Sequence, residues 1–402
     1  MSRLSEMIKE LCPDGVEYRK LKEIFDTRNG YTPSKSNDSY WENGTIPWFR
    51  MEDVRENGHI LSDSIQHVNL NAIKGELFPA NSIIVATSAT VGEHALITVP
   101  SLANQRFTYL MLKHEYANAF DIKFLFYYCY KLDLWCLSHL NQGSFPSVDM
   151  KQFSQFEIPV PLLAIQNEIV KLLDNFTELT AELTAELALR KKQYEWYCGS
   201  LIGGATFPKR KISDIATFRY GYTTSAATSG DARYIRITDI TDDGKLNPLD
   251  AKYTCISTEN KEYLLKRDDL VMARTGATYG KTLCYNMDTP AIYASFLIKI
   301  QVDETQMLPR FYWHFTRTPE YWGQANRLVT KGGQPQFNTG AIGRIVIPIP
   351  PLETQAKIVS ILDRFDALCH DLTQGLPAEI AARKKQYEYY RDKLLTFPRK
   401  GA

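Results

Sequence analysis

The chain has 402 residues, of which 44% are hydrophobic and 12% aromatic, and its formal net charge is +1. This composition predicts a folded protein with two or three cores of ordinary size and excludes a disordered chain. The start, MSRLSEMIKE, lacks the apolar region of a signal peptide, and no run approaches the ~20 apolar residues that span a bilayer. The seven cysteines are scattered and never form Cys-x-x-Cys, so we expect neither disulfides nor a zinc module, in keeping with a reducing cytoplasm.

Charge is distributed unevenly along the chain. Residues 1–157 contain 15 basic and 19 acidic side chains, whereas residues 207–346 contain 19 basic and 14 acidic ones. A near-neutral chain supplies little non-specific affinity for phosphates. If DNA is the ligand, a partner must therefore share that part of the binding.

Residues 1–157 mix short apolar strands with polar turns. Ser82–Thr87 and Arg106–Lys113 are expected to be strands because β-branched and aromatic residues dominate both runs. Phe120–Lys131 is expected to be a helix with one aromatic face. The intervening turns carry polar side chains that a ligand could contact.

Residues 158–206 contain a proline-rich strap followed by a long helix. The strap IPVP fixes an extended backbone and ends the preceding domain. Apolar residues then recur at three- and four-residue spacing, which predicts a coiled-coil seam. They are Ile169, Leu172, Phe176, Leu179, Leu183, Leu187, Tyr194 and Tyr197. A helix of ~35–38 residues would be ~55 Å long.

Residues 207–346 repeat the layout of residues 1–157. The expected strand Asp269–Arg274 corresponds to the Ser82 strand, and Thr275–Gly280 matches Thr87–Gly92 at an offset of 188. Phe296 matches Phe107, Arg236 matches Arg50, and the aromatic run 311–315 matches the expected aromatic helix. The framework positions agree while the loops differ.

Residues 347–402 repeat the strap and the helix. Residues 347–365 are identical to residues 158–176 at ten of nineteen positions, and RKKQYEYY near the end matches RKKQYEWY at seven of eight. This second helix carries Gly375-Leu-Pro377, where proline is expected to interrupt it. Because Lys20–Ile24 aligns with Lys211–Ile215, the chain begins where a repeat resumes, and we expect its two ends to lie close together.

The chain therefore predicts an α+β fold with two pseudo-symmetric globular α/β domains separated by two long antiparallel coiled-coil helices. The predicted parts are domain 1 (1–157), the first strap and helix (158–206), domain 2 (207–346) and the second strap and helix (347–402). This arrangement resembles the specificity subunit of a type I restriction–modification enzyme. The tandem Thr180-Ala-Glu-Leu183 and Thr184-Ala-Glu-Leu187 in the first helix adds to the resemblance.

The resemblance implies a DNA-recognition subunit without chemistry of its own. Each globular domain would recognise one half of a bipartite, asymmetric site, and the helices would set the gap and bind two methyltransferase subunits. S-adenosylmethionine, ATP and magnesium would belong to the methyltransferase and restriction subunits, and no membrane would be involved. The Arg-Lys-Lys segments at 190–192 and 383–385 could be solvated, or could contact the DNA backbone of the central gap or a partner subunit.

Side chains that pair with base edges or hold phosphates are the candidates for DNA contact. In domain 1 they are Thr32, Lys35, Arg50, Thr87, Ser88, Thr90, Asn104, Gln105, Arg106, Gln142 and Ser144. In domain 2 they are Arg219, Tyr220, Tyr222, Arg233, Arg236, Arg274, Thr275, Thr278, Tyr279, Lys281, Lys331, Gln334 and Gln336. For Arg50 and Arg236 the competing interpretation is an internal salt bridge with Asp53 or Asp239. Trp41, Trp48, Phe124 and Phe311 are expected in the core, and His314 in the core or on a helix surface.

Two other classes of protein stay open at this point. The chain could be a self-sufficient NTPase or nuclease that uses Lys281 after the Gly276–Gly280 turn, or the set Asp250, Glu259 and Lys261. A phosphate loop, however, needs four residues between its glycines, and this turn has three. It could also be a coiled-coil scaffold that binds no DNA, which would leave the differing loops unexplained. The histidines show no metal-ligand spacing.

Overall fold

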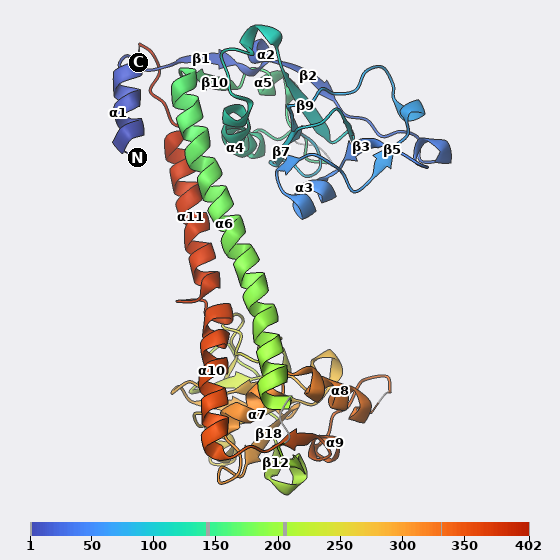
Figure 1. Cartoon of the computed structure of the whole chain (residues 1–402), viewed down its shortest axis with the longest axis vertical. Helices are drawn as coiled ribbons and strands as arrows, with labels where there is room; N and C mark the ends of the chain where they lie inside the picture. Colours follow the sequence, from blue (N-terminus) through green and yellow to red (C-terminus); the bar gives the residue numbers. More distant parts are fainter. Residues whose placement is uncertain (1, 142–144, 204–206, 331, 402) are drawn as a thin grey trace. The chain divides into compact units, whose positions relative to one another are not determined.

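The computed structural model describes residues 2–141, 145–203, 207–330 and 332–401. Contacts divide the chain into two compact units. The first runs to Thr180 and takes in the segment from Arg383 onward, whereas the second is the continuous segment Ala181–Ala382. The long helix α6 (Leu163–Cys198) therefore gives its first half to one unit and its second half to the other (Figure 1).

The globular part of the first unit has three layers. A five-stranded sheet of order β2-β9-β6-β7-β4 lies between helix α4 and a three-stranded sheet of order β5-β3-β8. Ile83 and Val85 of β6 point into the core under α4, whereas Ile84 and Ala86 point into the other core. All five residues of this strand are buried because both faces of the sheet are covered. The elements are α2 (Leu21–Ile24), β2 (Phe25–Asn29), β3 (Ile46–Phe49), α3 (Met51–Asn57), β4 (Ile60–Leu61), β5 (His67–Val68), β6 (Ser82–Ala86), β7 (His94–Ile97), β8 (Leu102–Ala103), β9 (Phe107–Leu112), α4 (Ile122–Ser138) and α5 (Met150–Phe153).

The second unit repeats this topology. Its sheets have the orders β12-β18-β15-β16 and β14-β13-β17, so β15 and β18 take the places of β6 and β9. The edge strand β4 has no counterpart among the strands described in the second unit. The elements are η5 (Ile212–Asp214), β12 (Ala216–Tyr220), β13 (Ala232–Ile235), β14 (Tyr253–Thr254), β15 (Leu270–Ala273), β16 (Thr282–Cys284), β17 (Ala291–Tyr293), β18 (Leu297–Val302), α7 (Pro309–Phe315), α8 (Pro319–Leu328) and α9 (Thr339–Gly343). The predicted duplication and the α+β class are confirmed.

Each strap forms a two-stranded ribbon with the start of its own domain. Strand β10 (Glu157–Val160) pairs with β1 (Glu17–Lys20), and β19 (Val346–Pro348) pairs with β11 (Lys209–Lys211), both antiparallel. The aligned segments after β1 and β11 both form one helical turn, α2 and η5, with buried isoleucine or leucine side chains. The strap thus closes the domain from which the long helix leaves.

One buried glutamine in each repeat fastens strap, domain and helix together. The side chain of Gln166 accepts a hydrogen bond from the Asp121 backbone N–H (2.9 Å) and donates to the carbonyls of Ala119 (2.8 Å) and Pro161 (2.7 Å). Gln355 makes the same three contacts with Leu308, Gln306 and Pro350, at 2.9, 2.8 and 2.8 Å. Both side chains are fully buried, so no water can replace these bonds. We call this contact the glutamine clamp.

One carboxylate in each repeat docks the long helix on the helix that covers the sheet. Asp174 accepts hydrogen bonds from Lys123 (2.7 Å) and Tyr127 (2.6 Å) of α4. Asp363 accepts hydrogen bonds from Arg310 and His314 of α7, both at 2.8 Å. Burial lowers the pKa of His314, and the contacts with His314 and Arg310 outweigh burial and lower the pKa of Asp363.

The long helices have the predicted lengths and the predicted interruption. Helix α6 has 36 residues, whereas its repeat is split into α10 (Leu352–His370) and α11 (Leu376–Leu394), with Pro377 at the start of α11. In the first unit the ring of Phe176 stacks on Tyr390, with centroids 5.6 Å apart. In the second unit Tyr197 lies 5.1 Å from Phe365 and Tyr194 lies 6.0 Å from His370, so the helices there run antiparallel. Leu179, a residue of the predicted seam, is exposed.

The two ends of the chain meet inside the first unit, as predicted (Figure 1). Val16 forms a parallel bridge with Arg399, and Leu4 of α1 (Ser2–Leu11) is buried in the same core as Leu394 and Leu395 of the C-terminal segment. The first core is therefore completed by residues from both termini.

The prediction of a single aromatic face on the first covering helix was wrong. The helix begins at Ile122 and continues to Ser138, and the six consecutive residues from Phe124 to Cys129 are all buried. The reason is that α4 is enclosed on several sides, because residues of β6, α6 and α11 belong to the core that surrounds it. Phe124, Phe311, His314 and Trp48 are buried, as expected, and Trp41 packs edge-on against Trp48.

Replacing Gln166 by alanine should destabilise the first unit by about 3 kcal/mol, because one N–H and two carbonyl groups lose their partners in a dry site. The measurement is the urea midpoint of the purified chain. The control is Asn167→Ala, the exposed neighbour on the same helix. Equal midpoints for the two variants would show that the glutamine clamp contributes nothing.

Candidate nucleic-acid interface

The loops at the ends of the central strands are fixed in the same way in both domains. In the first, Ala89 N–H donates to Pro146 O (2.8 Å) and Val148 N–H donates to Thr87 O (2.9 Å). In the second, Gly276 N–H donates to Pro335 O (3.0 Å) and Phe337 N–H donates to Arg274 O (2.7 Å). Ala89 and Gly276 share a left-handed backbone, with φ of 64° and 66°. We call this region the tip of each domain. It consists of the end of the central strand (β6 or β15), the adjoining end of its neighbour (β9 or β18) and the loop that is hydrogen-bonded to them (146–148 or 335–337).

These bonds correct two correspondences expected from the sequence. By its hydrogen bonds Thr87 is equivalent to Arg274 rather than to Thr275, because the second loop is one residue longer between this point and the following strand. Ala86 pairs with Phe107, and the equivalent Ala273 pairs with Leu297. Phe296 therefore takes the place of Arg106 and not that of Phe107. An ungapped alignment could not show this, because the inserted residue shifts the register inside a polar loop.

In the first domain the structure brings several of the predicted contact residues together at the tip. The Thr32 hydroxyl hydrogen-bonds to Gln105, and the Asn104 side chain accepts the Arg106 backbone N–H at 2.9 Å. Gln105, Arg106 and Lys35 are exposed, and Ser88 and Thr90 are half-buried. Gln142 and Ser144 lie outside the described residues. All of these stay predictions of DNA contact.

Thr87 and Thr275 do not present their side chains at the surface. They are 7% and 2% exposed, and the Thr87 hydroxyl bonds to that of Thr108 at 2.8 Å. Thr108 in turn donates to Asn29 (2.9 Å), which closes a polar network inside the tip. The sequence pattern could not distinguish this inward orientation from an outward one.

Arg50 and Arg236 occupy equivalent positions but have different partners. Asp239 accepts two hydrogen bonds from the Arg236 guanidinium, at 3.0 and 2.9 Å, and Asp250 lies 3.4 Å away. The internal salt bridge expected as an alternative is thus present in the second domain. In the first, Asp53 accepts the backbone N–H groups of Arg50 (2.6 Å) and Ile65 (2.5 Å), and the Arg50 guanidinium is instead 3.9 Å from Glu52.

Most of the other basic candidates in the second domain are also engaged. Arg219 forms an ion pair with Glu262, Lys281 forms one with Asp242, and Arg233 donates to the carbonyl of Asn247. Lys331 lies outside the described residues.

Some of the remaining candidates of the second domain lie near Arg274. Arg274 Nε donates to the carbonyl of Ser295 at 3.2 Å, and Nη1 lies 3.5 Å from Gln336 Oε1. The guanidinium lies 5.2 Å from the ring centre of Tyr220 and 5.5 Å from that of Phe296. Thr275 follows Arg274 in the chain, and the Gln334 side chain lies beside Gly276. Thr278 donates back to Thr275 O (3.2 Å), Tyr279 donates to Asn326 (2.6 Å) and the Tyr222 hydroxyl lies 3.4 Å from Glu259.

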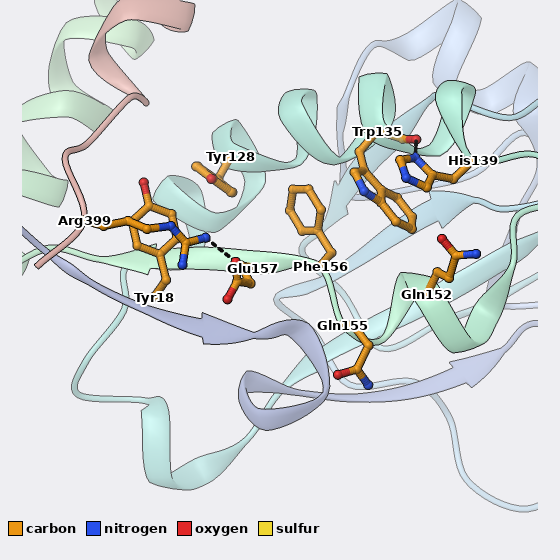
Figure 2. A pocket seen from close by; sticks show the side chains of 9 residues that line it. All are labelled: Tyr18, Tyr128, Trp135, His139, Gln152, Gln155, Phe156, Glu157 and Arg399. Carbon is orange, nitrogen blue, oxygen red and sulfur yellow. Dashed lines mark hydrogen bonds and ion pairs between the residues drawn. The ribbon is translucent and has the colours of Figure 1, made fainter. Parts of the chain in front are cut away.

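Sequence reasoning missed Phe296, which is 52% exposed. The available signal was an aromatic residue in a polar loop. This signal was overlooked because Phe296 had been matched with Phe107. It also missed a cavity of about 480 Å³ in the first unit, which none of the predicted contact residues lines. Figure 2 shows the ion pair of Arg399 with Glu157 beside Tyr18 and the stack of Trp135 on His139, whose centroids are 4.0 Å apart.

The turn Gly276–Gly280 lacks the surroundings of a phosphate loop. It leads into strand β16 instead of a helix, and Lys281 is held by Asp242. Asp250 is held by Arg236 and Lys252, the latter at 2.6 Å. Neither set of residues proposed for a self-sufficient NTPase or nuclease is arranged for that chemistry, so no observation supports that alternative.

The fold and the paired tips define an internally duplicated protein with two equivalent domains that carry different side chains at matching positions. The family of type I restriction modification DNA specificity domains matches residues 13–189 and again residues 205–382. The chain belongs to this family. No helix in the described parts of the chain is long and apolar enough to cross a membrane.

Relatives and solved structures agree with this assignment. The chain is 40% identical to the specificity subunit of the type I restriction enzyme EcoprrI from Escherichia coli, over 93% of each chain. It is 28% identical to the EcoR124I/EcoR124II specificity subunit from Escherichia coli, over 69% of this chain and 71% of the relative. Its fold is similar to that of a chain in a structure describing complex assembly and conformational transition of the type I R-M system, with a TM-score of 0.65, 15% identity and coverage of 95% and 97%.

Replacing Arg236 by alanine should destabilise the second unit by about 3 kcal/mol, because Asp239 is buried and would be left without its cation. Arg219→Ala, which opens an exposed pair with Glu262, should cost less than about 1 kcal/mol. Urea unfolding of both variants measures the difference. The double variant Arg236→Ala/Asp239→Asn should recover part of the loss, and no recovery would show that the buried charge is not the cause.

Proposed function

We propose that this chain is the sequence-recognition subunit of a type I restriction–modification complex, with each globular domain binding one half of a bipartite, asymmetric DNA site. Family membership supports the class of protein. The observation that carries the two-half assignment is the pair of tips, which share backbone hydrogen bonds and differ in side chains. A common frame with different surface groups suits two domains that recognise different base sequences.

The partners in this proposal are double-stranded DNA, two methyltransferase subunits and the restriction subunits. Exposed apolar side chains on the helices, Leu189, Trp196 and Tyr389, and Leu372 in the turn between α10 and α11 support a protein partner there. The four lysines of the Arg-Lys-Lys segments are exposed. They are free to face solvent or to meet that partner.

The chain supplies recognition and its partners supply the reaction. S-adenosylmethionine, ATP and magnesium are assigned to the partner subunits, and the complex acts on cytoplasmic DNA. The net charge of +1 fits a subunit that leaves much of the phosphate binding to its partners.

Exchanging residues 207–346 for those of another family member should change one half of the methylated sequence and leave the other half unchanged. The reason is that the exchanged segment contains the whole second tip and none of the first. Single-molecule sequencing of modified bases in a host that carries the complex measures both halves. A change in both halves would contradict the assignment of one half to each domain.

Deleting Thr184–Leu187 should shorten the unspecified gap and leave both half-sites intact. These four residues lie inside the continuous helix α6 and correspond to ~6 Å of its length, or nearly two base-pair steps. The same sequencing experiment measures the gap. Altered bases in either half-site, with an unchanged gap, would rule out a spacer role for the helix.

A further inference from the structure

Arg274 differs from Arg219, Arg236 and Lys281, three other predicted contact residues of the second domain, in having no acidic partner among the described residues. Arg219, Arg236 and Lys281 each pair with a carboxylate, so binding DNA through them would require an existing ion pair to open. Within the described residues, Arg274 contacts only neutral groups, namely a carbonyl, an amide oxygen and two aromatic rings. Its positive charge is therefore available to a ligand.

The surroundings of Arg274 also hold it in one orientation. Its Nε donates to the Ser295 carbonyl, and Tyr220 and Phe296 contact the guanidinium. These two rings are 43% and 52% exposed, so a ligand can reach the guanidinium and the rings beside it. With one N–H given to Ser295 and one directed at Gln336, three of the five N–H donors of the guanidinium remain for a ligand.

The first tip shows that the frame itself does not require an arginine at this position. The equivalent residue is Thr87, which is buried in the network with Thr108 and Asn29. Conversely, Arg106 is exposed where the second tip carries Phe296. The two domains thus place their guanidinium groups at the ends of different strands of the same frame.

We propose that Arg274 recognises a guanine in the half-site bound by the second domain; this inference rests on the proposed function. A guanidinium fork donates to N7 and O6 of guanine in the major groove, and no other base offers two acceptors at those positions. Lysine has a point charge in place of the fork and discriminates less well. Arg274 is accordingly a specificity-determining residue of the second domain.

The first test is the methylated sequence of the complete complex with Arg274→Lys or Arg274→Ala. One guanine of the second half-site should lose its preference by roughly 5- to 100-fold while every other position is retained. The matched control is Arg267→Ala, an exposed arginine paired with Asp288 in the same domain, which should leave the sequence unchanged. Thermal unfolding of each variant complex checks that the fold is intact.

The second test uses the purified complex and duplexes in which that guanine is replaced by 7-deazaguanine, which lacks the N7 acceptor. Wild-type binding should weaken, whereas binding by Arg274→Ala should be insensitive to the replacement. Equal sensitivity of the two proteins would overturn the proposal. Weaker binding to all sequences, with a smaller dependence on salt, would identify Arg274 as a phosphate contact and would equally overturn it.

The two levels of the proposal fail separately. If the wild-type complex methylates no bipartite sequence, the proposed function is wrong. If it does, and Arg274→Lys retains the same preference at every position, only the assignment of Arg274 is wrong.

Discussion

The glutamine clamp is the contact on which the arrangement within each unit depends. The domain offers two buried backbone groups and the strap offers one, and a single amide side chain in the first turn of the long helix satisfies all three. An amide is suited to this because it donates and accepts at once and carries no charge that burial would penalise. Gln355 has the same geometry, so a glutamine at the equivalent position of each repeat fixes the direction in which the helix leaves its domain.

The docking carboxylates add a second level of control that is less symmetric. Asp174 uses a lysine and a tyrosine, whereas Asp363 uses an arginine and a buried histidine. In the second unit Asp366, one turn further along, also pairs with His370 (3.2 Å), Arg317 (2.6 Å) and Lys245 (3.0 Å), and these contacts overcome burial and lower its pKa strongly. The second helix–domain contact is therefore more ionic than the first.

The repeated sequence predicted the architecture well because the residues that recur are those that make the same structural contacts in both copies. The strap prolines, the clamp glutamines and the docking aspartates recur at one offset, and the break at Pro377 follows from its missing N–H. The tips were predicted less well. Their register shifts by one residue inside a loop, and burial of Thr87 depends on Thr108 and Asn29, which come from strands distant in sequence.

The partners of individual arginines were the least predictable feature. Arg50 and Arg236 have an aspartate three residues later in both cases, yet only Arg236 uses it, because Asp53 is already occupied by the Ile65 backbone. The three-residue spacing is compatible with an arginine–aspartate ion pair in both domains. Whether the pair forms depends on the path of the following loop. The same applies to Arg274, whose neutral surroundings come from two separate loops.

The closure of the first unit by both ends of the chain has a consequence for biosynthesis. Residues 181–382 are synthesised before the segment that begins at Arg383, so the first unit stays open until the last part of the chain has been made. Until Leu394, Leu395 and Phe397 arrive, one side of the earlier-made core faces solvent. The part of the protein that is translated first is thus the last to be finished.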